Sequence, residues 1–115
     1  MTWAFVELTG FTQSLSLFFA SDDEYRAFQN VLLSNPERGE VIMGTGGLRK
    51  ARWGDTRRGK GTRGGIRVIY LLLPEQKTIV FLRAYNKDKQ DDLTTEQRKQ
   101  FAAIAEAVRQ ELSKT

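Results

Sequence analysis

The sequence predicts one small α+β domain, in which an antiparallel β-sheet carries helices packed on one face. The chain has 115 residues, of which 40% are hydrophobic and 28% charged, and this suits a single buried core. Helical apolar spacing occurs near both ends of the chain, and alternating or β-branched runs fill its centre. We therefore expect the order β-α-α-β-β-β-α over residues 1–115, with the last three strands in a meander.

The first third of the chain predicts a strand followed by two helices. Residues 3–8 read as the strand, and residues 11–19 as a short helix. A longer helix begins after Ser21, because three acidic residues follow it in the pattern of a capping box. This helix ends at Asn35, since the residue before a proline avoids the helical conformation. The core candidates are Phe5, Val6, Tyr25, Phe28, Val31 and Leu32.

The centre of the chain predicts three strands. After a glycine-punctuated connection over residues 39–47, residues 48–53 alternate, so that Lys50 and Arg52 face away from Ala51 and Trp53. Two further strands follow, separated by a turn: residues 66–73, an apolar run that suits a strand covered on both faces, and residues 78–85.

The last helix is predicted from its start signal and its apolar spacing. Thr94 and Gln97 have the spacing of a capping box, in which each side chain bonds the other residue's backbone. Apolar residues then recur every three or four positions, as they do on the buried face of a helix. The expected core stripe consists of Phe101, Ile104, Ala105, Val108 and Leu112.

Charge is concentrated in one segment. The net charge is +4, yet residues 49–67 hold eight basic residues against the single acid Asp55, a net charge of +7. The rest of the chain holds ten basic and thirteen acidic residues, a net charge of −3. This segregation predicts a polyanion-binding site, although a solvated basic loop without a partner shows the same pattern. The eight are Arg49, Lys50, Arg52, Arg57, Arg58, Lys60, Arg63 and Arg67.

The residue types that the chain lacks exclude several chemistries. It has no cysteine and no histidine, which nearly excludes an ordinary zinc site and rules out a Ser-His-Asp triad. Asp55 is the single acid in the basic segment, so we expect neither a two-metal site nor any other cofactor. No run is long enough to span a bilayer, and residues 1–20 lack the basic start of a signal peptide. We expect a cytoplasmic protein without a membrane partner.

Glycines in the basic segment imitate two nucleotide-binding motifs. Residues 59–64 match G-x-G-x-x-G, but the dinucleotide-binding motif requires a helix after it, and here a strand follows. A near match to the phosphate-binding P-loop fails because Gly61 replaces the required Ser or Thr. What remains is a loop whose cations can follow a phosphate backbone: Arg57, Arg58, Lys60 and Arg63.

Lys50, Arg52 and Arg67 are the candidates for a reaction centre. Arg67 interrupts an apolar strand, and a lone buried guanidinium is costly, so its alternation should place it beside Lys50 and Arg52 on an open face. The alternative is an arginine at a strand end that pairs with a surface carboxylate. Tyr85 closes the last strand, where it serves either as a core aromatic or as a stacking surface for a nucleobase.

Four stretches of the sequence resemble HigB-type members of the RelE/ParE toxin superfamily. They follow one another in the family's order and span nearly the whole chain. The stretches are Asp23-Glu24-Tyr25-Arg26-Ala27-Phe28-Gln29 with Asn35-Pro36, Gly44-Thr45-Gly46-Gly47-Leu48-Arg49-Lys50, Gly64-Gly65-Ile66-Arg67-Val68-Ile69-Tyr70, and the tail with Tyr85, Lys87, Leu93 and Thr94.

The resemblance implies a small microbial ribonuclease that cuts mRNA in the ribosomal A site. The family's attributed mechanism is attack of the RNA 2′-oxygen on the adjacent phosphate, with basic residues in place of histidines. The resemblance also implies a co-encoded antitoxin, expected to carry a helix-turn-helix domain, and contact with operator DNA only through that antitoxin. By position, the catalytic roles fall on Lys50, Arg52, Arg67 and Lys87, with Tyr85 adjacent.

Arg52 departs from the family pattern, because some relatives have a lysine there. Arginine does not readily lose its proton, so Arg52 can stabilise charge but cannot act as a base. Lys50 could act as the base if neighbouring cations favour its neutral form. The resemblance therefore leaves open which group takes the 2′-proton.

Two other functions are compatible with the sequence. One is a ParE-like inhibitor of another target without nuclease activity, against which the cluster of Lys50, Arg52 and Arg67 argues, because a protein-directed inhibitor needs no converging cations. The other is a non-enzymatic RNA- or DNA-binding module, which the +7 segment alone would permit.

Overall fold

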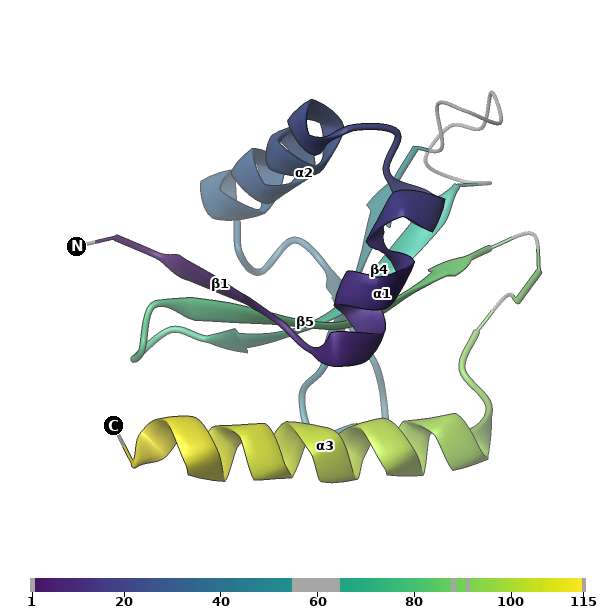
Figure 1. Cartoon of the computed structure of the whole chain (residues 1–115). Coiled ribbons are helices and arrows are strands. Elements are labelled where there is room, and N and C mark those ends of the chain that lie inside the picture. The colour runs from purple at the N-terminus through teal and green to yellow at the C-terminus, as the bar shows by residue number, and fades with distance from the viewer. Residues whose placement is uncertain (1, 55–64, 88, 91, 115) are drawn as a thin grey trace.

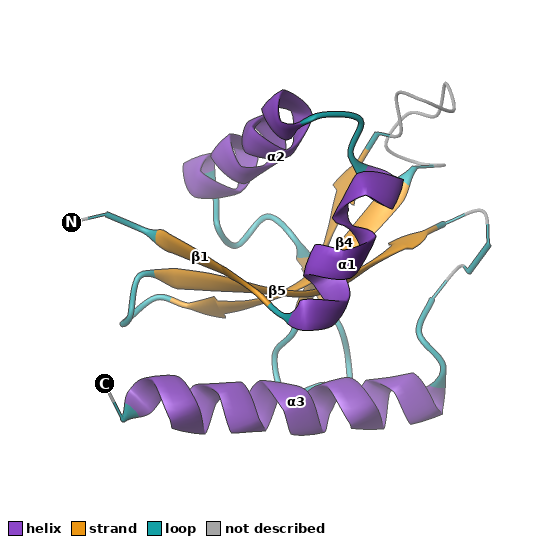
Figure 2. Cartoon of the chain, in the orientation of Figure 1, coloured by secondary structure: helices purple, strands orange, loops and turns teal. Residues whose placement is uncertain are grey.

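The computed structural model describes residues 2–54, 65–87, 89–90 and 92–114. It confirms the α+β class and the predicted order of elements, with one added short strand (Figure 2). No helix in the described ranges combines the length and the apolar character needed to cross a membrane. The elements are β1 (Ala4–Glu7), α1 (Thr9–Phe18), α2 (Asp22–Ser34), β2 (Glu40–Val41), β3 (Arg49–Trp53), β4 (Ile66–Leu73), β5 (Thr78–Asn86) and α3 (Thr95–Ser113).

The five strands form one mixed sheet in the order β1-β5-β4-β3-β2. The meander of β3, β4 and β5 is antiparallel, as predicted. The prediction of a wholly antiparallel sheet is wrong, because β1 lies parallel to β5 at the sheet edge. Two helices separate β1 from the rest of the sheet in the chain, so β1 is not joined to a neighbour by a hairpin and is free to run in parallel.

Helices cover both faces of the sheet, so the prediction that they pack on one face is wrong. Figure 1 shows α1 and α2 on one side and α3 on the other. The cause is the apolar run of β4 and β5, which alternates between two cores. The α1/α2-side cluster includes Phe11, Phe28, Val68, Tyr70, Ile79 and Phe81. The α3-side cluster includes Ile69, Leu71, Val80, Tyr85, Phe101 and Ala105.

The helix starts follow the sequence signals. The Ser21 hydroxyl accepts a hydrogen bond from the Glu24 backbone N–H (3.1 Å). Thr94 and Gln97 form the reciprocal capping box that their spacing predicts. Two predicted core residues are exposed instead: Val6 on the edge strand β1, and Ile104 on α3.

The short strand β2 lies inside the predicted connection over residues 39–47, and a contact at Gly39 places it. The Tyr70 hydroxyl accepts a hydrogen bond from the Gly39 N–H (3.0 Å) and donates one to the Pro36 carbonyl (2.8 Å). A Cβ atom at Gly39 would lie 2.7 Å from the Tyr70 side chain and 2.9 Å from the Lys50 carbonyl. Only glycine allows the chain to approach β3 this closely, and the approach sets Glu40 opposite Lys50 in the sheet.

Candidate active site

Three cations and a tyrosine lie across neighbouring strands at one end of the sheet, where β3 and β5 finish and β4 begins. Lys50 and Arg52 share one face of β3, because side chains alternate along a strand. Arg52 pairs in register with Arg67 of β4, and Arg67 pairs with Tyr85 of β5. The structure therefore brings four of the predicted site residues to one face.

Arg67 lies deeper than the sequence predicts. Only 4% of its surface is exposed, so the prediction that it projects from an open sheet face is wrong. Burial lowers the pKa of its guanidinium and the neighbouring Arg52 lowers it further, whereas Tyr85 and Glu40 raise it. A buried cation facing a second cation favours the approach of an anion, because the anion's charge offsets both desolvation and repulsion.

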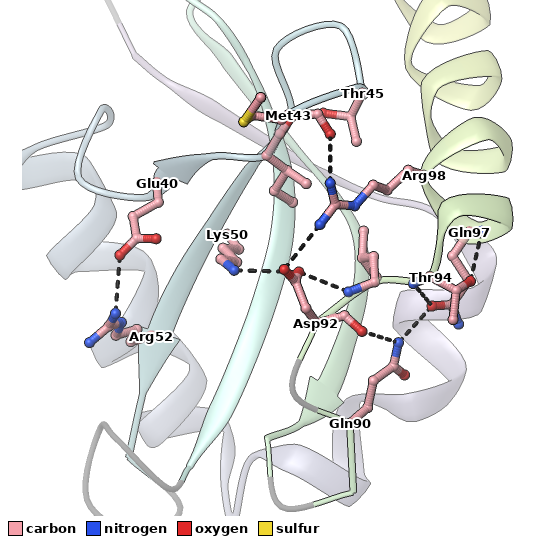
Figure 3. A network of polar contacts seen from close by, with 12 residues as sticks. Glu40, Met43, Thr45, Lys50, Arg52, Gln90, Asp92, Thr94, Gln97 and Arg98 are labelled. Carbon is pink, nitrogen blue, oxygen red and sulfur yellow. Dashed lines mark hydrogen bonds and ion pairs between the residues drawn. The ribbon is translucent and has the colours of Figure 1, made fainter.

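Glu40 is an acidic member of this site that sequence reasoning missed. Its carboxylate Oε1 lies 3.0 Å from Nη2 of Arg52, as Figure 3 shows. Glu40 and Arg52 line a hollow of about 170 Å³ together with Arg38 and Lys50. The sequence interpretation placed Glu40 in a loop and counted Asp55 as the only nearby acid. The available signal was Glu40-Val41-Ile42 directly after Gly39, a pattern too short to predict a strand by itself.

Lys50 also belongs to a second ion-pair network, formed with Asp92 and Arg98 (Figure 3). The Lys50 ammonium lies 3.5 Å from Oδ1 of Asp92, and Nη2 of Arg98 lies 3.0 Å from Oδ2. Oδ1 also accepts a hydrogen bond from the Leu93 N–H (2.8 Å). Partial burial raises the pKa of Asp92, but the Leu93 hydrogen bond and the charges of Lys50 and Arg98 outweigh it, so the pKa lies below its usual range. Asp92 thus ties Lys50 to the start of α3.

Arg98 also links this network to the connection between β2 and β3. Its Nη1 donates to the carbonyl of Met43 (3.4 Å), so one guanidinium contacts both Asp92 and the connection (Figure 3). Sequence reasoning missed Arg98 and Asp92, since both lie more than forty residues from Lys50 in the chain.

The remaining predicted site residues are placed differently. Arg49 points to the opposite face of β3, and its Nη1 donates to the carbonyls of Glu37 (2.9 Å) and Gly39 (2.8 Å). The structure therefore does not bring Arg49 together with Lys50, Arg52 and Arg67. Lys87 follows β5 and is held near the start of β4 by its N–H, which donates to the Gly65 carbonyl (3.0 Å). The predicted phosphate-binding residues Arg57, Arg58, Lys60 and Arg63 lie outside the described residues.

The sequence is compatible with two roles for Tyr85, as an aromatic residue of the core or as a stacking surface for a nucleobase. The structure favours the first for its ring, because Tyr85 is 6% exposed and belongs to the α3-side cluster. Its predicted part in catalysis stays a prediction.

The fold and the grouped cations are those of a small α+β protein suited to contact a phosphate-bearing polymer. A comparison with protein-family models finds that residues 37–115 match the family described as RelE toxin of the RelE / RelB toxin-antitoxin system. The match covers more than half of the chain and includes Lys50, Arg52, Arg67 and Tyr85. The chain therefore belongs to the RelE toxin family, and it is a toxin with a cognate antitoxin. The narrower HigB-type resemblance stays a prediction.

Proposed function

We propose that this protein is a HigB-type toxin, a ribosome-dependent mRNA endoribonuclease that works without a metal ion and that its cognate antitoxin holds inactive. The observation that carries the proposal is the cross-strand pair of Arg52 and Arg67 beside Lys50, with Arg67 buried and facing a second cation. Such cations stabilise a phosphate more strongly as its negative charge grows in the transition state.

The proposed reaction begins with attack of an RNA 2′-oxygen on the adjacent phosphate. Arg52 and Arg67 stabilise the pentacoordinate phosphate, and Lys50 takes part in proton transfer. Tyr85 and Lys87 stand at the end of β5, next to the start of β4, and complete the proposed catalytic group. The cations Arg57, Arg58, Lys60 and Arg63 are proposed to bind the RNA backbone. Arg49 is left out of this proposal, because its guanidinium contacts the carbonyls of Glu37 and Gly39 on the opposite face of β3.

The proposed partners are the ribosome with its mRNA and a co-encoded antitoxin. An unrestrained mRNA nuclease would arrest its own host, so the toxin needs an inhibitor made with it. The antitoxin is proposed to carry a helix-turn-helix domain, so that the toxin reaches operator DNA only through it. We propose that the protein acts in the cytoplasm, where ribosomes are found.

The proposal is tested by purified translation with primer-extension mapping of the mRNA. Toxin released from its antitoxin should stop translation and leave cuts in phase with codons, and a substrate with a 2′-deoxy nucleotide at the cut position should remain whole. Arrested growth with intact mRNA would instead indicate an inhibitor of another target. RNA binding with neither arrest nor cleavage would indicate a non-enzymatic module.

A further inference from the structure

The proposed cleavage needs a group that accepts the proton of the attacking 2′-hydroxyl. We infer that Glu40 is this group, so that the base of the reaction is a carboxylate on β2 rather than a lysine. The inference rests on the proposed nuclease activity and names a catalytic residue within it.

Glu40 stands where a base is required. It pairs in register with Lys50, and its Oε1 lies 3.0 Å from Nη2 of Arg52, so any phosphate held by these two cations lies beside its carboxylate. The side chain is 62% exposed and lines the hollow shared with Lys50 and Arg52, so a bound hydroxyl can reach it. The contact between Gly39 and Tyr70 fixes the backbone directly before it.

The neighbouring groups are less suited to take a proton. Arginine does not readily lose its proton, so neither Arg52 nor Arg67 is suited to act as a base. Tyr85 is buried, and the oxygens of Asp92 already accept from the Leu93 N–H, Lys50 and Arg98. Lys50 would have to give up its ion pair with Asp92 to become a neutral base. In the described part of the chain, Glu40 is the carboxylate that lines the hollow with Lys50 and Arg52.

Two side chains from adjacent strands, Glu40 of β2 and Lys50 of β3, then account for both proton transfers of the reaction. Glu40 takes the 2′-proton as the 2′-oxygen forms its bond to phosphorus, while Arg52 and Arg67 stabilise the charge on the phosphoryl oxygens. The bond between phosphorus and the 5′-oxygen breaks, and the Lys50 ammonium donates a proton to that oxygen. The products are a 2′,3′-cyclic phosphate and a 5′-hydroxyl, and water exchanges the two transferred protons afterwards.

An ordinary surface ion pair is the competing explanation of the Glu40–Arg52 contact. Exposed ion pairs contribute little to stability, and an isosteric amide would keep Arg52 in place by accepting the same hydrogen bond. Glu40→Gln therefore separates the two explanations, because the amide retains the acceptor and removes the ability to take a proton. Among the described residues, the charged groups that line a hollow with Glu40 are Arg38, Lys50, Arg52, Asp92 and Arg98, and the Glu40 charge also acts on Arg67.

The experiment measures single-turnover cleavage of ribosome-bound mRNA at saturating toxin. Glu40→Gln should lower the cleavage rate by roughly 100- to 10,000-fold, the usual contribution of a general base, without weakening ribosome binding. Wild-type cleavage should depend less on pH than cleavage by the amide variant, because the wild-type reaction does not rely on hydroxide. The residual Glu40→Gln rate should rise about tenfold per pH unit, because hydroxide must then remove the proton. Glu75→Gln, an exposed acid in the turn at the far end of β4, is the matched control.

A substrate with sulfur in place of the 5′-oxygen separates the base from the acid. A thiolate leaves without being protonated, so this substrate should restore the Lys50→Met rate and leave the Glu40→Gln defect in place. Restoration of Glu40→Gln instead would make Glu40 the acid and overturn the inference.

Two further results would overturn the base assignment while leaving the nuclease activity standing. One is a Glu40→Gln rate within a few-fold of wild type, and the other is a reduced rate with an unchanged pH profile. Glu40→Asp, which keeps the carboxylate, should retain more activity than the amide variant if Glu40 is the base. A wild-type toxin that leaves mRNA intact would refute the nuclease proposal itself.

Discussion

Arg67 should limit the stability of this protein while serving its activity, and Arg67→Met tests both effects at once. The guanidinium is almost wholly buried and faces Arg52 across the strand pair. Burial and Arg52 both disfavour the charged form, which is the direction in which the pKa is shifted. Because the folded state lowers this pKa, the charge opposes folding at all pH values below it, including neutral pH.

Arg67→Met should raise the stability of the protein and lower its cleavage rate. Replacement of interacting buried charges by apolar side chains of similar volume ranges from neutral to stabilising by about 1–4 kcal/mol, and here the repulsion from Arg52 is removed as well. Arg67→Met also loses the favourable contacts of the guanidinium, among them the hydrogen bond to the Ile66 carbonyl, and this places our expectation at the lower end, about 1 kcal/mol. For a domain of this size the midpoint of thermal unfolding should rise by about 4 °C. Cleavage should fall about 100- to 1000-fold, because one transition-state donor is lost.

Thermal unfolding and single-turnover cleavage of the same preparation measure the two effects. Arg26→Met removes an exposed cation on α2, on the opposite face of the sheet, and should change neither quantity appreciably. An Arg67→Met protein that is less stable than wild type but cleaves normally would refute the reasoning on both counts, since Arg67 would then be a structural residue.

Three other predictions follow from the described contacts and from the basic segment. Asp92→Asn should reduce the free energy of unfolding at pH 7 by at most about 1 kcal/mol, because the carboxylate is partly exposed. The difference from wild type should disappear as the pH falls through the lowered pKa of Asp92, and urea unfolding at pH 7 and pH 3 measures it. Thr94→Ala should cost about 1 kcal/mol in urea unfolding and Thr94→Ser much less, because only the alanine lacks the capping hydroxyl. Neutralising Arg57 and Arg58 together should make RNA binding less sensitive to salt: the slope of the logarithm of the binding constant against the logarithm of the salt concentration should decrease by roughly 0.7 to 0.9 per lost phosphate contact. A large loss of single-turnover cleavage at unchanged affinity would instead make these residues catalytic.

Much of the fold was predictable because it depends on local regularities. Strand alternation placed Lys50 and Arg52 together, and the capping signals at Ser21 and Thr94 gave the starts of two helices correctly. The place of Arg67 next to Arg52 followed from its parity in the strand, although its burial did not. These features arise within a few residues of chain, where backbone geometry dictates which side chains share a face.

The sequence by itself thus determined the α+β class, most of the elements, the segregated charge and the resemblance to the toxin superfamily. Only the tertiary structure decided that helices cover both faces, that β1 runs parallel to β5, and that Glu40 and Asp92 flank Lys50. Asp92 lies forty-two residues from Lys50, and the strand pairing of Glu40 depends on the room left at Gly39. Such contacts depend on how whole elements pack against one another, and local periodicity carries no information about that packing.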